Sequence, residues 1–141
     1  MDVLIIEPEM IPRIASIGND LKSLQQVVGG LIEATYPYDD PVAIICNEEG
    51  KILGLPLNRK LEDYDIIAGT FIICGLSEDN FDSLTPELMK KYYNKFFQPE
   101  LFLRMGNKIL GIPMEPEDLL NSLDSSTLLQ GASSNLIQVK A

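Results

Sequence analysis

Six polar and charged side chains lie within thirteen consecutive positions, and these are the residues in the sequence best suited to chemistry. They are Asn47, Glu48, Glu49, Lys51, Asn58 and Arg59. A carboxylate at position 48 or 49 could act as a general base or bind a hard divalent metal, and the two cations suit an anion. Carboxylates need burial or a like-charged neighbour to raise their pKa for acid–base work. Because adjacent residues in a turn are solvated, we do not expect that shift here.

The segment that carries these residues has the pattern of a β-hairpin. Val42–Cys46 is apolar and β-branched, which predicts a buried strand, and Asn47–Gly50 has the composition of a turn. Lys51–Leu55 is predicted to return as the second strand, with Asn58 and Arg59 just beyond its end. Three interpretations stay open: a solvated polar hairpin tip, a binding pocket in which Asn58 and Arg59 contact a ligand or partner, and a catalytic site.

The residue inventory narrows the chemistry further. The chain contains no histidine, which excludes histidine-based zinc sites, imidazole acid–base catalysis and the Ser-His-Asp and Cys-His arrangements. Its two cysteines, Cys46 and Cys74, lie in apolar runs, where a free thiol behaves as a small core side chain. We therefore predict no catalytic residues, no metal site and no cofactor, and expect that the protein is not an enzyme.

Composition and charge set the class of protein. The chain has 141 residues, 45% of them hydrophobic, and carries 21 acidic against 11 basic side chains for a net charge of -10. That field repels phosphate backbones, so direct binding to nucleic acid is not expected. The acidic surface serves solubility, or it presents carboxylates to a basic partner that itself binds nucleic acid. The short apolar run Val3–Ile6 is neither a signal peptide nor a membrane span, which predicts a cytoplasmic protein with no membrane contact.

The remaining patterns predict one α+β domain over 1–113, with a mixed or antiparallel sheet built largely from hairpins and a few short helices packed on one face. Strands are expected at 2–7, 13–17, 31–36 and 65–75, an acidic loop at 60–65, helices at 21–28 and after 85, a helical turn at 77–80, and a hairpin around 106–107. Gly29 is predicted to end the first helix, and Thr85-Pro86 to begin the second. Residues 114–141 are predicted to be a C-terminal extension, with a short helix followed by a mobile tail.

Three stretches together resemble a known family. They are LQQVVGGLIE at 24–33, NEEGK at 47–51 continuing to LPLNR at 55–59, and DIIAGT at 65–70. The combination resembles the uncharacterised family catalogued as domain of unknown function 3846, over about residues 1–113. Its members are small proteins of bacteriophages, plasmids and conjugative elements. The resemblance implies an accessory protein made in the bacterial cytoplasm, and it brings no established reaction, ligand or catalytic residue.

Three functional hypotheses follow. The first is a non-enzymatic binding protein of a phage or other mobile element that docks on a host or element-encoded protein, and so antagonises a defence or regulatory system. The second is a binding or sequestering protein for a small nucleotide-like signal, with Lys51 and Arg59 as anion contacts. The third is an enzyme that uses Glu48 or Glu49 with a divalent metal, and it is the least favoured. The oligomeric state is left open.

Overall fold

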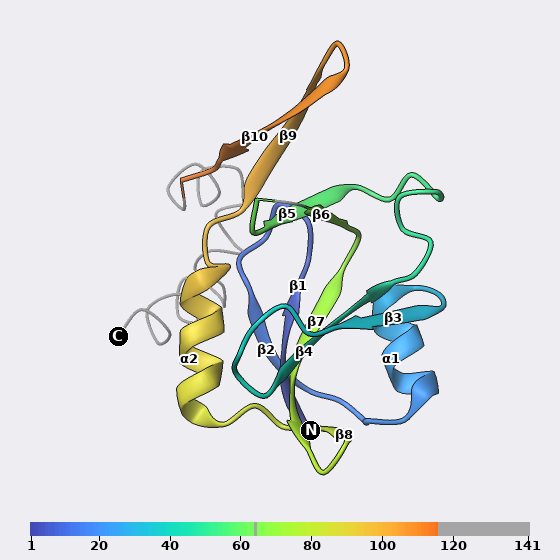
Figure 1. The fold of residues 1–141 in the computed structure, drawn as a ribbon, viewed down its shortest axis with the longest axis vertical. Helices are drawn as coiled ribbons and strands as arrows, with labels where there is room; N and C mark the ends of the chain where they lie inside the picture. Colours follow the sequence, from blue (N-terminus) through green and yellow to red (C-terminus); the bar gives the residue numbers. More distant parts are fainter. Residues whose placement is uncertain (64, 116–141) are drawn as a thin grey trace, which may run out of the picture.

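An antiparallel sheet occupies the centre of the molecule, with its strands in the order β2-β1-β7-β4-β3 and the short β8 paired to β7 (Figure 1). The computed structural model describes residues 1–63 and 65–115. The strands of this sheet are β1 (Asp2–Ile6), β2 (Arg13–Ser16), β3 (Ile32–Thr35), β4 (Val42–Asn47), β7 (Phe71–Ser77) and β8 (Asn80–Asp82). The central strands β1, β7 and β4 are buried on both faces, which explains their uninterrupted apolar runs.

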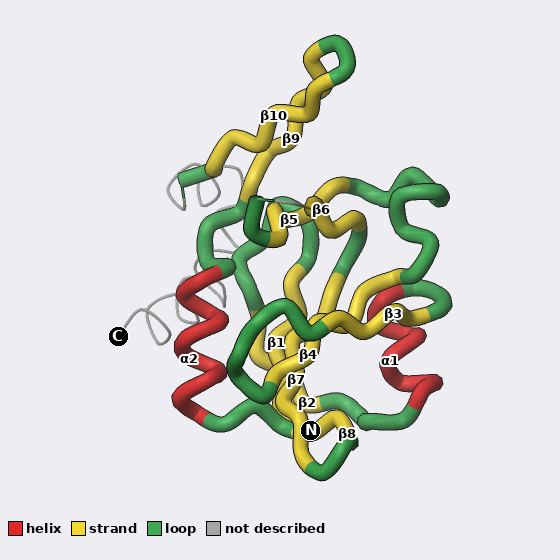
Figure 2. Tube along the Cα trace, viewed as in Figure 1, coloured by secondary structure: helices red, strands yellow, loops and turns green. Residues whose placement is uncertain are grey.

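Two helices cover opposite faces of this sheet (Figure 2). They are α1 (Leu21–Val28) and α2 (Pro86–Lys95). Helix α1 packs on the face that carries Val3 and Ile5, whereas α2 packs on the face that carries Leu4 and Ile6. The prediction that the helices share one face is therefore wrong. Successive strand side chains point to opposite faces, and both sets are apolar here, so each face needs a cover.

The helix ends agree with their sequence signals. Asp20 caps α1 by accepting a hydrogen bond from the Ser23 amide, and Gly29 ends it in the left-handed region at φ 78°. Thr85 caps α2 by accepting a hydrogen bond from the Leu88 amide. Both predicted helices are confirmed, because capping depends on residues within one turn of the helix end.

The predicted hairpin after β4 is wrong. Residues 48–56 form turns, and the next strand, β5 (Leu57–Leu61), pairs instead with β6 (Asp65–Ala68) in a separate two-stranded sheet. Strand β4 already has β3 on one side and β7 on the other, so no edge is left for a returning strand. The expected acidic loop at 60–65 is likewise replaced by the end of β5 and a short turn.

The predicted strand over 65–75 is divided at Gly69. This glycine has φ 82°, and a Cβ at its position would lie 2.8 Å from Cδ1 of Leu55. The chain therefore leaves the small β5–β6 sheet there and enters the central sheet as β7. A helical turn predicted at 77–80 is also wrong, because Glu78 and Asp79 take positive φ angles in a tight turn that leads into β8.

A two-stranded ribbon follows α2 and extends away from the body of the molecule (Figure 1). Its strands are β9 (Glu100–Met105) and β10 (Lys108–Pro113). The turn at Gly106-Asn107 confirms the predicted hairpin, with Gly106 at φ 62°. The helix and tail predicted beyond this ribbon lie, from residue 116 onward, outside the described residues. Within the described ranges, no helix is long and apolar enough to cross a membrane.

Candidate functional site

The six clustered residues of the sequence do not form one site. Asn58 is fully buried, and its side-chain amide donates hydrogen bonds of 2.8 Å to the carbonyl oxygens of Ile6 and Gly69. These two bonds connect β5 to the end of β1 and to Gly69, where the chain passes from the β5–β6 sheet into the central sheet. Of the three interpretations, the one that places Asn58 in a solvated hairpin tip is wrong, because its amide satisfies backbone carbonyls in the interior.

Arg59 is also buried, with 1% of its surface exposed. Its guanidinium donates to the carbonyl oxygens of Met10, Asn58 and Phe96, and to Oδ1 of Asn58 at 2.9 Å. Burial lowers the pKa of Arg59 to about 10, opposed in part by the negative charge of Glu100. The group stays cationic at neutral pH and joins three separate segments. It is a structural cation and is not available to a ligand.

The first half of the cluster closes the turn after β4. Asn47 is buried, donates to the carbonyl oxygen of Val28 at 3.2 Å and accepts from the Glu49 amide at 2.8 Å. Glu48 and Glu49 are exposed at the surface of that turn. The described residues contain no group of three or more acidic or cysteine side chains placed to hold a metal ion.

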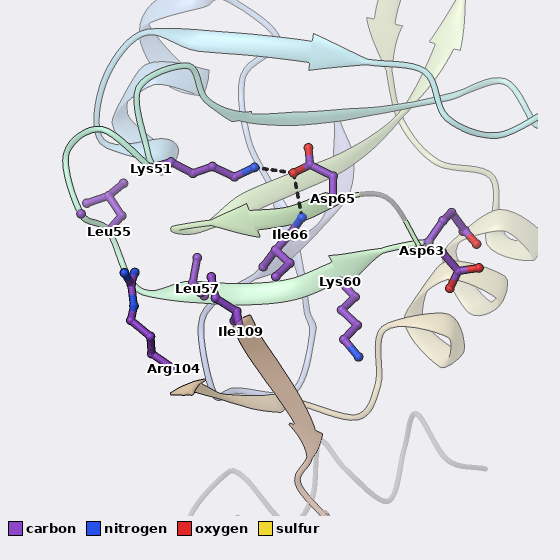
Figure 3. Close-up of a pocket in the computed structure, with 11 residues that line it drawn as sticks. Lys51, Leu55, Leu57, Lys60, Asp63, Asp65, Ile66, Arg104 and Ile109 are labelled. Atoms are coloured by element: carbon purple, nitrogen blue, oxygen red, sulfur yellow. Dashed lines mark hydrogen bonds and ion pairs between the residues drawn. The ribbon is translucent and has the colours of Figure 1, made fainter. Parts of the chain in front are cut away.

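Lys51 is the member of the cluster that reaches a cavity. Its ammonium pairs with the carboxylate of Asp65 on β6. Burial disfavours ionisation of this carboxylate, but hydrogen bonds from Lys51 and from the Ile66 amide outweigh burial and lower the pKa of Asp65. The pair closes one side of an open groove (Figure 3).

This groove, of about 720 Å³, lies between the 51–57 loop, the β5–β6 sheet and the β9–β10 ribbon. Its lining residues are Lys51, Gly54, Leu55, Leu57, Lys60, Glu62, Asp63, Asp65, Ile66, Arg104 and Ile109. Figure 3 shows that Arg104 and Asp63 lie at opposite ends of β5, with Leu57 and Ile109 between them. The volume lies within the range of small-molecule sites. We call it the ribbon groove.

The side of the ribbon that faces away from this groove is apolar except for Lys108, which lies opposite Met105. The strand register places five apolar side chains on it, each 38–62% exposed: Leu101, Leu103, Met105, Leu110 and Ile112. The opposite side carries Arg104 and Ile109, which line the groove, and Glu100, which accepts a hydrogen bond from the Lys60 amide at 2.8 Å. We call the five-residue surface the outer face.

Two further groups of polar side chains serve the fold. Asp40 accepts from Lys91 at 2.6 Å and from the hydroxyl of Tyr92 at 2.7 Å, and these bonds lower the pKa of Asp40. They hold the segment before β4 against α2. Burial raises the pKa of the Cys46 thiol to about 11 and that of Cys74 to about 12, so both thiols are protonated core groups at neutral pH.

Sequence reasoning missed most of the groove. Lys60, Arg104 and Ile109 come from strands separated by α2 and by part of the central sheet. The predicted hairpin around Gly106-Asn107 was the one usable signal, because it places alternating residues on two faces. Nothing in the sequence pattern says which face meets β5.

Comparison with known proteins identifies the family of the chain. Residues 1–97 match the family model described as "Domain of unknown function (DUF3846)". The chain belongs to this family. The match ends at residue 97, short of the expected 113, so the groove of this DUF3846 protein combines residues inside the matched region with Arg104 and Ile109 beyond it. No curated protein and no solved structure matches the chain.

Proposed function

We propose that this DUF3846 protein is a non-enzymatic accessory protein of a bacteriophage or other mobile element, and that it acts in the bacterial cytoplasm by docking on a protein. The observation that carries the proposal is the outer face of the ribbon. Five apolar side chains lie side by side there, and in the described part of the chain each keeps 38–62% of its surface exposed. Contiguous apolar patches of this kind are typical of docking surfaces.

The chemistry of the surroundings favours a protein partner over a membrane or a nucleic acid. The chain has a net charge of -10, which repels anionic lipid surfaces and phosphate backbones alike. A partner with an apolar patch inside a basic surface would complement both the apolar outer face and the negative charge of this chain. We infer that the partner is a nucleic-acid-binding defence or regulatory protein of the host, whose basic surface would attract this acidic chain, and that docking blocks its function.

The alternative hypothesis is a nucleotide-like ligand held by Lys51 and Arg59. The hydrogen bonds of the Arg59 guanidinium do not support it. Every nitrogen of this guanidinium donates to an oxygen of the protein itself, two of them in the interior and one at Met10 on the surface. Lys51 is paired with Asp65. The absence of histidine from the sequence and the exposure of Glu48 and Glu49 agree with a protein that binds without catalysing.

The test compares the wild-type protein with an outer-face variant, Leu103→Ser with Leu110→Ser, in capture experiments from a bacterial lysate. These residues are directly opposite each other on the two strands. We expect one stoichiometric partner that the wild type retains and that the double variant binds at least about tenfold more weakly, as for the centre of an interface. Capture should also weaken as salt rises from about 50 mM to about 0.5 M.

The matched control is Ile52→Ser, which changes an apolar residue that is 85% exposed but lies outside the ribbon. It should leave capture unchanged. Failure to retain any partner at low salt, or equal retention by the double variant, would overturn the proposal. So would light scattering that shows a homodimer dissolved by the outer-face substitutions, because the face would then belong to a second copy of the chain.

A further inference from the structure

Two cations of the ribbon groove, Lys60 and Arg104, form no ion pair with any residue that the structure describes. Among the described residues, Lys51 is paired with Asp65, and Glu62 is paired with Lys95 at 3.1 Å. The described chain provides no ion pair for Lys60 or Arg104. Once the internal pairs are removed, the groove retains these two positive charges and the single negative charge of Asp63. Glu100 also lies beside Lys60, since its Oε1 and the Cε of Lys60 would be 3.4 Å and 2.8 Å from a Cβ at Gly111. Arg104, at the opposite end of β5 from Asp63, is left as the cation available to a ligand.

The two cations approach the groove from opposite walls. Lys60 is on β5, and its stem lies against the ribbon, because a Cβ at Gly111 would be 2.8 Å from Cε of Lys60. Arg104 is on β9, where its cross-strand neighbour is Ile109. Figure 3 shows Lys60 directed from β5 toward the ribbon and Arg104 directed from the ribbon toward the 51–57 loop. The fold therefore places in one groove two cations that are separated by 44 positions (104 minus 60) in the sequence.

Between these charges the lining is apolar. Leu55, Leu57, Ile66 and Ile109 contribute side chains from the loop, from both strands of the β5–β6 sheet and from the ribbon. A ligand that fills this space must match an apolar wall and must also supply a negative charge within reach of Lys60 or Arg104. Asp63, at the far end of β5 from Arg104, disfavours a second anionic group there.

We propose that the ribbon groove binds a small organic anion: an apolar acyl or aromatic body that carries one carboxylate, sulfonate or phosphate group. The anionic group contacts Arg104, Lys60 adds a second positive charge to the same groove, and the apolar body lies against Leu57 and Ile109. This site is separate from the outer face used for docking, because Arg104 and its neighbour Leu103 point to opposite sides of β9. Either proposal can fail without the other.

The experiment uses a pair of probes that differ only in charge, titrated into the full chain and followed by fluorescence and by NMR. 8-Anilinonaphthalene-1-sulfonate has the aromatic body and one anion, and N-phenyl-1-naphthylamine is the same body without the sulfonate. We expect the sulfonate to bind roughly tenfold more tightly, and to shift the methyl signals of Ile66 and Ile109. Inorganic phosphate alone should not compete at millimolar concentration, because it lacks the apolar body.

Substitutions of Lys60 and Arg104 test whether these two cations bind the sulfonate group. Lys60→Gln with Arg104→Gln should weaken sulfonate binding by roughly tenfold and leave the neutral probe unchanged. Lys108→Gln, which removes a cation from the other side of the same ribbon, is the matched control and should change neither. Equal affinity for the two probes in the wild type would overturn the proposal, and this measurement does not depend on how well a variant folds. Methyl shifts confined to Leu103 and Leu110 of the outer face would overturn it as well.

Discussion

Replacing Arg59 with methionine tests how this fold is held together, because the substitution keeps an unbranched apolar stem and removes the charge and the hydrogen-bond donors. Two effects oppose each other. Lowering the pKa of Arg59 from 12.5 to about 10 corresponds to about 3 kcal/mol of unfavourable charge burial, which the substitution relieves. Against this stand the guanidinium's hydrogen bonds to the carbonyl oxygens of Met10, Asn58 and Phe96 and to Oδ1 of Asn58.

The hydrogen bonds are the larger effect. Each bond from a charged donor contributes about 1.5–3 kcal/mol, and the buried acceptors are left unsatisfied without it. Met10 lies at the surface, so water can replace its bond. We therefore expect Arg59→Met to lower the free energy of unfolding by about 3–5 kcal/mol, the balance between the interior hydrogen bonds that are lost and the charge burial that is relieved. That is a large part of the ~5–15 kcal/mol that stabilises a domain.

Urea denaturation followed by far-ultraviolet circular dichroism measures this change. With a slope of about 2 kcal/mol per molar urea, the midpoint should fall by about 2 M. Arg104→Met is the matched control, since that arginine is exposed, and its effect should stay within about 0.5 kcal/mol. An Arg59→Met variant as stable as the wild type would refute the reasoning, because charge burial would then cancel the hydrogen bonds.

Three further outcomes follow from the same structure. Asp40 and Asp65 have pKa values below the ordinary 3.8, so the folded state binds fewer protons than the unfolded chain; the melting temperature should fall as pH drops below about 4. The thiols of Cys46 and Cys74, with pKa values raised to about 11 and about 12, should react with iodoacetamide at pH 8 far more slowly in the folded protein than in urea. Gly69→Ala should lower the free energy of unfolding by about 1–2 kcal/mol in urea titrations, because φ 82° strains any other residue; an unchanged midpoint would contradict this.

The sequence predicted the features that depend on near neighbours in the chain. The ends of α1 and α2 follow from Asp20, Gly29 and Thr85, each of which acts within one helical turn. The β9–β10 ribbon follows from Gly106, whose positive φ closes a two-residue turn. Apolar periodicity likewise predicted the α+β class. A helix or strand with a buried face shows its characteristic apolar spacing whichever element packs against that face.

The candidate site could be predicted only in part, since its residues acquire their roles from distant partners. Lys51 does line the groove, but its neighbours there were not foreseen. Asn58 and Arg59 looked like polar residues at the end of a hairpin. The structure buries them, because Asn58 finds acceptors in Ile6 and Gly69 and Arg59 finds one in Phe96.

The sequence by itself therefore determined the positions of α1 and α2 and of most of the strands, the acidic charge, and the absence of imidazole chemistry. Tertiary structure alone decided which strands pair, which face each helix covers, and which cations are left to face solvent. The break at Gly69 shows the reason: an apolar run over 65–75 is equally consistent with one strand or two. Strand β4 has both edges occupied by β3 and β7, so the chain beyond it pairs elsewhere and forms the wall of the groove.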